Sequence, residues 1–301
     1  MSGAGTGGAI RPPLVTAPGF DRLEAARVGN FVTACYTMYN NGNAPLKPAP
    51  IDVPIGYTVH DYIIMSDFLI WGRRIQAFYG FIATNQDGSE SVVAMRGTVG
   101  STEWIDNILF AGLIPFDVNG VSYGMVHRGF GQIYQTIDVR PAGQDPNTAT
   151  TRDDRTFADK VADAIARHRA TIRAVAPNPR ITVAAHSLGA ALLTQYILEN
   201  EIKRRLDNVV AFTFASPRVG DQTFVDAYNA LPHITTWRIH LKEDLVPNLP
   251  PDTWGYVHVA QDIEFSTAGL GVQDNPVCNH VIATYLYVLD PAHNRIGDCK
   301  A

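Results

Sequence analysis

The chain has 301 residues, of which 46% are hydrophobic and 18% are charged, with a formal net charge of -5 and an isoelectric point near 6.0. This length and composition allow a large buried core. The negative charge and the absence of extended Lys or Arg runs exclude the basic field of a nucleic-acid-binding protein, so nucleic acid is not an expected partner.

The N-terminal residues are rich in glycine, and we expect residues 1–20 to be a flexible leader. Residues 1–13 lack the apolar core of a signal peptide, and no apolar stretch is long enough to predict a transmembrane segment. The sequence shows no internal repeat and no shift of composition that would mark a boundary. We therefore expect residues 1–301 to form one domain.

The first predicted element is a helix over residues 21–39, where apolar positions recur at helical spacing until turn residues stop the pattern at 40–42. A Pro-rich connector follows. Three runs of β-branched and aromatic residues then predict strands that are antiparallel and feed a sheet, over residues 57–65, 75–83 and 91–95.

A short amphipathic helix is expected over residues 102–110. Its apolar stripe consists of Trp104, Ile105, Ile108 and Leu109. The stripe gives this helix one apolar face, as in a helix that is permanently packed on the core.

Strands and helices alternate in the second half of the chain. Helical spacing predicts helices at 126–130, 157–175, 190–206, 224–231 and 281–289, and apolar runs predict strands at 209–214, 235–241 and 256–265. This alternation is typical of an α/β fold with a mainly parallel central sheet, linked by right-handed crossovers and covered by helices on both faces.

The strongest local motif is the pentapeptide at 185–189, Ala-His-Ser-Leu-Gly, between a predicted strand and a predicted helix. It is a variant of the G-x-S-x-G nucleophile elbow, in which small residues let the chain turn sharply and expose the oxygen of Ser187. Ala185 stands where the first Gly is usual. The alternative interpretation is a serine at the start of a buried helix.

A nucleophilic serine needs a histidine as base and a carboxylate to orient it, and in this fold both follow the serine in the chain. Asp244 is the expected acid because it comes directly after the strand at 235–241. Two histidines compete for the base. His280 follows a polar loop and is favoured, whereas His258 lies in an alternating strand pattern and is expected to be structural, as is His186 beside the serine.

The remaining histidines and the three cysteines show no metal-ligand spacing, so no metal site is expected. The cysteines can form at most one disulfide bond. Three reduced, buried thiols are the alternative.

Taken together, these motifs resemble the class 3 lipases, which are the fungal-type triacylglycerol lipases, and their relatives the feruloyl esterases. The resemblance covers about residues 21–299 and implies an α/β-hydrolase fold. It rests on residues 96–98, 104–105, 126–130, 185–189, 214–220, 244–251 and 279–280. The chain departs from the family pattern at Ala185 and Ala190, where Gly is usual, and in the acidic residue at 106–107.

The resemblance implies a catalytic triad of Ser187, Asp244 and His280. It places the oxyanion hole at the backbone N–H of Leu188 and at the N–H and hydroxyl of Thr98. The helix at 102–109, with Trp104, Ile105, Ile108 and Leu109, would be a lid that contacts substrate. By analogy, a disulfide bond would join Cys35 to Cys299 and leave Cys278 free, and the protein would be secreted.

The expected function is therefore a serine carboxylic-ester hydrolase, a triacylglycerol lipase that acts at a lipid–water interface as a monomer, without a cofactor. The apolar lid stripe favours a lipase over a feruloyl-type or short-chain esterase. A non-catalytic binding module on the same fold is the alternative from another class.

Overall fold

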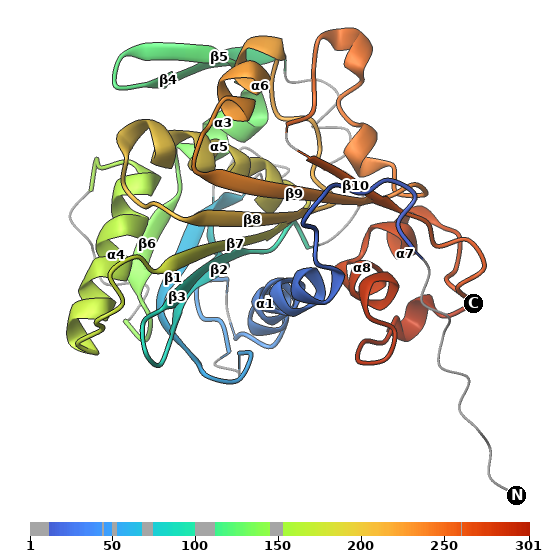
Figure 1. The fold of residues 1–301 in the computed structure, drawn as a ribbon, viewed down its shortest axis with the longest axis horizontal. Helices are drawn as coiled ribbons and strands as arrows, with labels where there is room; N and C mark the ends of the chain where they lie inside the picture. Colours follow the sequence, from blue (N-terminus) through green and yellow to red (C-terminus); the bar gives the residue numbers. More distant parts are fainter. Residues whose placement is uncertain are drawn as a thin grey trace, which may run out of the picture.

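A computed structural model describes residues 12–43, 45–49, 53–67, 75–99, 112–144, 153–259 and 261–301. Its centre is an eight-stranded sheet with the order β10-β9-β8-β7-β3-β2-β1-β6 (Figure 1). The strands of this sheet are β1 (Tyr57–Asp67), β2 (Ile75–Asn85), β3 (Glu90–Met95), β6 (Asp138–Pro141), β7 (Arg180–His186), β8 (Val209–Phe214), β9 (Ile234–Leu241) and β10 (Gln261–Phe265).

The sheet has a parallel half and an antiparallel half. Strands β3, β7, β8, β9 and β10 pair in parallel, whereas β3–β2, β2–β1 and β1–β6 pair antiparallel. This confirms both the mainly parallel α/β architecture and the antiparallel arrangement of the first three strands. The carboxyl ends of the parallel strands share one edge of the sheet, where binding sites of α/β folds form.

Helices cover both faces of the sheet (Figure 1). One face carries α1 (Arg22–Asn40) and α8 (Ile282–Leu289), which pack against each other, with the short α7 (Pro276–His280) beside them. The other face carries α3 (Arg128–Tyr134), α4 (Phe157–Thr171), α5 (Leu188–Lys203) and α6 (Gln222–Asn229). Each face has its own buried apolar cluster, so the sheet is buried on both sides. None of the described helices combines the length and the hydropathy needed to cross a bilayer.

Residues 12–20 belong to the packed fold, so the expectation of a flexible leader over residues 1–20 is wrong for this part. Val15 forms an antiparallel bridge with Glu264 of β10, and Phe20 packs edge-on against Trp237 with ring centroids 5.7 Å apart. Hydrogen bonding to the edge strand and aromatic packing hold this segment in place. Residues 1–11 lie outside the described residues.

Residues 113–127 form a hairpin that was not expected from the sequence. Its strands, β4 (Leu113–Val118) and β5 (Val121–His127), are joined by Asn119 and Gly120, which both have positive φ. The expected helix at 126–130 therefore starts later, at Arg128, and the expected strand at 256–265 is limited to β10. The predicted helix at 102–110 falls outside the described residues.

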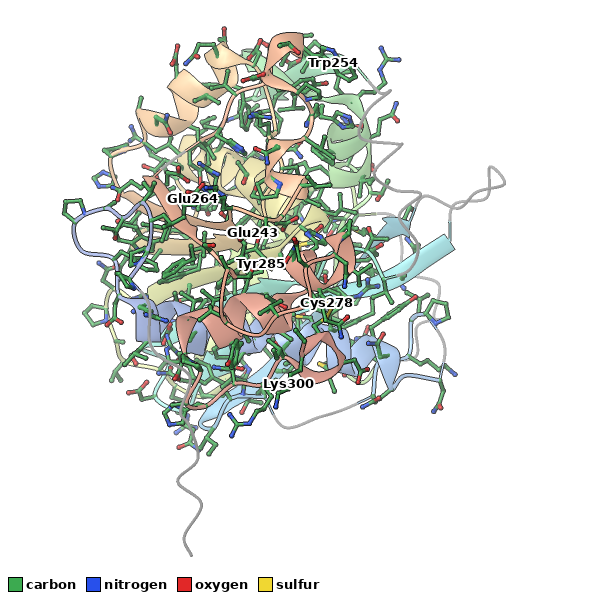
Figure 2. The ribbon with its side chains drawn as sticks, turned by 90° about the vertical axis from the view of Figure 1, so that its right-hand side faces the viewer. Glu243, Trp254, Glu264, Cys278, Tyr285 and Lys300 are labelled. Atoms are coloured by element: carbon green, nitrogen blue, oxygen red, sulfur yellow. A yellow bond between two sulfur atoms is a disulfide. The ribbon has the colours of Figure 1, made fainter. Side chains whose placement is uncertain are left out.

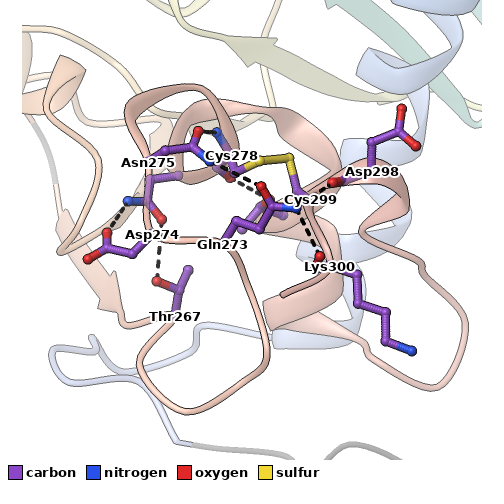
Figure 3. The surroundings of a disulfide bond; sticks show 10 residues. Thr267, Gln273, Asp274, Asn275, Cys278, Asp298, Cys299 and Lys300 are labelled. Carbon is purple, nitrogen blue, oxygen red and sulfur yellow. Dashed lines mark hydrogen bonds between the residues drawn. A yellow bond between two sulfur atoms is a disulfide. The ribbon is translucent and has the colours of Figure 1, made fainter.

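The disulfide bond joins Cys278 to Cys299, with 5.3 Å between their Cα atoms (Figure 3). The expected Cys35–Cys299 pairing is wrong, because Cys35 lies on α1 inside the core and is a free, fully buried thiol. Beside the bridge, Gln273 bonds the backbone carbonyls of Asp298 and Lys300, both at 2.9 Å. The C-terminal segment is thus attached next to α7.

Candidate active site

Ser187 occupies a sharp turn between β7 and α5, as the elbow motif predicts. Its backbone has φ 56° and ψ -126°, a combination that non-glycine residues rarely adopt and that costs about 1–3 kcal/mol. Small neighbours make the turn possible: a Cβ atom at Gly189 would lie 2.5 Å from the carbonyl oxygen of Arg96. Ala185, at the position where Gly is usual, is accommodated as a fully buried residue.

His280, at the end of α7, lies between the serine and an acid. Its Nε2 atom is 2.9 Å from Oγ of Ser187, and its Nδ1 atom is 2.9 Å from Oδ2 of Asp244. Asp244 follows β9, at the same sheet edge as the elbow. The structure therefore brings together the three side chains that the sequence places far apart, in the geometry by which a histidine activates a serine.

Asp244 is buried, with 1% of its surface exposed, and its carboxylate is held by three donors. Oδ1 accepts the backbone N–H of Val246 at 3.0 Å, and Oδ2 accepts the hydroxyl of Tyr285 at 2.7 Å in addition to His280. Burial, and then the charge of Asp244, raise the pKa of Tyr285 well above its ordinary value, so this phenol stays protonated and donates. Figure 2 shows Tyr285 on α8 near the segment that carries Glu243, the residue before Asp244.

The competing histidine, His258, makes a structural contact. Its Nε2 atom lies 2.7 Å from the carbonyl oxygen of Pro247, in the loop that follows Asp244. Burial, reinforced by the nearby cations Arg238 and Arg218, lowers its pKa well below 6.5 and keeps it neutral. This agrees with the interpretation of His258 as a hydrogen-bonded ring.

The loop after β3 approaches the serine closely. A Cβ atom at Gly97 would lie 2.7 Å from Cβ of Ser187, so only glycine fits there. Arg96, fully buried between the rings of Tyr39 and Tyr79, bonds the carbonyl oxygen of Gly97 at 2.7 Å. Thr98 is the next residue, and Leu188 follows Ser187 directly as the first residue of α5. Of the two expected oxyanion positions, Leu188 therefore adjoins the serine in the chain, and Thr98 follows the glycine that approaches it.

The four expected lid residues, Trp104, Ile105, Ile108 and Leu109, lie outside the described residues. No group of three or more His, Cys, Asp or Glu side chains in the described part of the chain could hold a metal ion.

Tyr285 and Tyr36 both contact this site, although no sequence motif marks them. Tyr285 is a phenol within an apolar helical run, and Tyr36 lies four residues after Val32 on the buried face of α1. A phenol on the inward face of a helix usually bonds a polar group, which is the signal that could mark both positions.

Residues 92–254 match the sequence model of the family described as lipase (class 3). Among curated relatives, the chain is 28% identical to phospholipase A1-IIgamma of Arabidopsis thaliana, over 80% of this chain and 58% of that protein. It is 30% identical to phospholipase A1-II 1 of Oryza sativa subsp. indica, over 76% of this chain and 59% of the relative. The chain thus spans somewhat more than half the length of these relatives.

Solved structures show the same fold. The lipase from Rhizopus microsporus var. chinensis matches with a TM-score of 0.56 at 21% identity, over 87% of this chain and 81% of that one. Lipase II from Rhizopus niveus matches with a TM-score of 0.57 at 18% identity, over 83% of each chain. The fold is therefore that of the α/β hydrolases, and, since the family match covers more than half of its residues, the chain belongs to the class 3 lipase family.

Proposed function

We propose that this protein hydrolyses the fatty-acyl esters of glycerolipids through an acyl-enzyme on Ser187. The observation that carries the proposal is the continuous contact from Oγ of Ser187 through the ring of His280 to Asp244, with both distances 2.9 Å. This arrangement makes a serine hydroxyl nucleophilic without a cofactor.

In the proposed reaction, Ser187 attacks the ester carbonyl while His280 takes the hydroxyl proton. The imidazolium then gives this proton to the leaving alcohol, and Asp244 holds the ring and stabilises its charge. Water, activated by the same histidine, releases the fatty acid. The N–H of Leu188 and the N–H and hydroxyl of Thr98 would bind the oxyanion, and each donor of this kind contributes about 2.7–4 kcal/mol.

Apolar side chains beside these residues support a lipid substrate. Val99, Leu245 and Val277 are 41%, 56% and 59% exposed, although each is a large apolar residue. Val99 follows Thr98, Leu245 follows Asp244, and Val277 lies three residues before His280. Exposed apolar surface next to a site favours acyl chains over small polar esters. The apolar stripe at 104–109 points the same way, and we propose it as a lid.

Triacylglycerol is the substrate that the proposed lid favours, because an apolar cover opens most favourably on an oil surface. Phospholipid is the second candidate, because the curated relatives described above are named phospholipases A1. A feruloyl-type or short-chain esterase remains the weaker alternative, since it needs no apolar surface around the site.

The experiment compares the protein with its Ser187→Ala variant on p-nitrophenyl butyrate, on a triacylglycerol emulsion and on phosphatidylcholine vesicles. We expect hydrolysis by the protein and none by the variant. Release of fatty acid from the emulsion alone would assign a triacylglycerol lipase, and release from the vesicles would assign a phospholipase. A variant that retains full activity, or a protein that a fluorophosphonate does not label, would overturn the proposal.

We also propose that the protein works outside the reducing cytosol, as expected of a secreted protein. The Cys278–Cys299 bond supports this, because structural disulfides persist in oxidising compartments. Non-reducing mass spectrometry of the protein from its native source should find this bond intact, and a pair of free thiols would contradict the proposal.

A further inference from the structure

A line of hydrogen bonds through Tyr36 and His186 connects the backbone of Gly97 with the backbone of His280. The hydroxyl oxygen of Tyr36 lies 2.8 Å from the backbone nitrogen of Gly97 and 2.8 Å from Nδ1 of His186. On the other side of the ring, Nε2 of His186 lies 2.7 Å from the carbonyl oxygen of His280. Two side chains thus link the loop after β3, the elbow and α7.

The partners fix the direction of every bond in this line. A carbonyl oxygen can only accept, so Nε2 of His186 carries a proton and donates to His280. Burial, and then the proximity of His280, lower the pKa of His186 well below 6.5, so the ring is neutral and its Nδ1 accepts. Tyr36 therefore donates to His186 and accepts the N–H of Gly97, and each group has its partner.

At one end, the line holds the peptide groups next to the expected oxyanion hole. The N–H of Gly97 bonds Tyr36, and its carbonyl bonds Arg96 at 2.7 Å. A Cβ atom at this position would lie 2.7 Å from Cβ of Ser187 and 2.8 Å from the hydroxyl oxygen of Tyr36, so the backbone is confined between the nucleophile and the phenol. The donors of Thr98 follow directly from this confined residue.

At the other end, the line holds the backbone of the proposed base. His186 is 2% exposed, and its ring centroid lies 4.7 Å from that of His280. The ring N–H of His186 bonds the backbone carbonyl of His280, the last residue of α7. The ring of His280 must stay between Ser187 and Asp244. Because the His186 ring is neutral, it places no second positive charge beside His280 when His280 takes up the proton of Ser187.

We propose that Tyr36 and His186 are positioning residues for ester hydrolysis, which hold the oxyanion loop at Gly97–Thr98 and the backbone of His280 in register with Ser187. This inference rests on the proposed function. Neither side chain touches the reacting atoms, so their effect must appear through Thr98 and His280.

The test measures kcat and KM for p-nitrophenyl butyrate in the full chain. Tyr36→Phe keeps the ring and removes only the hydroxyl, so Gly97 and His186 each lose a partner. Because small displacements of catalytic groups cost large factors in rate, we expect kcat to fall at least about tenfold, with KM changed less than about twofold. A kcat within about twofold of the parent would overturn the proposal.

Tyr228→Phe is the matched control. The hydroxyl of Tyr228 is also buried and bonds Thr236 at 2.7 Å, but it lies on α6, outside the site. This variant should lose stability with an unchanged kcat. If Tyr228→Phe lowered kcat as much as Tyr36→Phe at the same folded fraction, measured by circular dichroism, the effect would be a general loss of structure and the proposal would fail.

A second comparison asks whether Tyr36 acts through the oxyanion loop. Thr98→Val removes the Thr98 hydroxyl, and in this background Tyr36→Phe should lower kcat less than it does alone, because interacting residues are not additive. Full additivity would overturn the link to Thr98.

If Tyr36→Phe does not fold, the variant His186→Asn replaces it. The asparagine amide can accept the hydrogen bond from Tyr36 but does not reach His280, so kcat should again fall with KM unchanged.

These outcomes separate the inference from the proposed function. If Ser187→Ala abolishes hydrolysis while Tyr36→Phe retains it, the proposed function stands and the inference fails. If Ser187→Ala retains hydrolysis, the proposed function itself fails.

Discussion

Tyr285 donates its hydroxyl, at 2.7 Å, to Oδ2 of Asp244, the same oxygen that lies 2.9 Å from Nδ1 of His280. The phenol is buried, and its oxygen also accepts the backbone N–H of Leu241 at 3.3 Å. Through these hydrogen bonds, the side chain of Tyr285 links α8 to the end of β9 and to the acid of the candidate triad. Removing a hydrogen-bond donor from a buried carboxylate is costly.

Tyr285→Phe should destabilise the protein by about 1.5–3 kcal/mol, the usual contribution of a hydrogen bond to a charged group. It should also lower kcat, because Asp244 loses one of the donors that fix it. Tyr196→Phe is the control: Tyr196 is fully buried on α5, and its hydroxyl has no hydrogen-bond partner within the described structure. Urea unfolding should show no destabilisation for this control, and equal losses for both variants would contradict the assigned role of Tyr285.

The stability of the protein should fall as the pH drops below about 6.5. Burial lowers the pKa of His186 and His258 well below that ordinary value. Between the folded and unfolded pKa values, the unfolded chain binds more protons than the folded one, so acid favours unfolding by up to about 1.4 kcal/mol per pH unit for each ring. Urea unfolding at several pH values from 5 to 8 measures this slope.

His258→Gln provides the control for this pH dependence, because its amide N–H can still bond Pro247 but does not titrate. In His258→Gln, the unfolding free energy should depend less steeply on pH below 6.5. The difference from the parent should equal the contribution of one histidine. A free energy that is flat between pH 5 and 7 in the parent protein would show that these rings titrate normally in the folded state.

His280→Ala should reduce hydrolysis about 10⁶-fold, as expected when the histidine of a triad is removed. His258→Gln should reduce it by less than about fivefold, because His258 contacts the backbone carbonyl of Pro247, in the loop after Asp244, and glutamine can keep that contact. Both rates are compared at equal folded fractions. The reverse order of effects would make His258 the base.

The order of the triad could be predicted because each member follows a clear pattern. Ser187 ends an apolar β-branched run, and Asp244 comes directly after another. The hairpin β4–β5 was not predicted, although Asn119-Gly120 is a strong signal for a two-residue turn. The strand at Leu113–Val118 contains Pro115 and does not show a regular apolar alternation.

Other features depend on contacts that no local pattern contains. With three cysteines the sequence allows three pairings, and only the burial of Cys35 in the core and the proximity of Cys278 to Cys299 decide between them. The contact of Tyr36 with His186 joins residues 150 positions apart. Helical spacing places Tyr36 on the inner face of α1, but it does not show which partner the hydroxyl meets.

Reduction should destabilise the protein through the Cys278–Cys299 bond alone. This bond closes a loop with a sequence separation of 21, for which the chain-entropy estimate gives about 3 kcal/mol. Dithiothreitol should lower the melting temperature of the parent and of Cys35→Ala, but not that of the double variant Cys278→Ala/Cys299→Ala. If Cys35→Ala removed the response, the bond would involve Cys35 instead.

The proposed lid predicts how the rate depends on the physical state of the substrate. The apolar face that the sequence predicts for Trp104, Ile105, Ile108 and Leu109 would gain about 25 cal/mol for each square ångström that an oil surface removes from water. Hydrolysis of tributyrin should therefore rise steeply once its concentration exceeds the solubility limit. Replacing Ile108 and Leu109 by Ser should reduce this rise while leaving hydrolysis of dissolved p-nitrophenyl butyrate within about twofold, because the triad is unchanged. A rate that increases smoothly across the solubility limit in the parent would rule out a lid that opens at the interface.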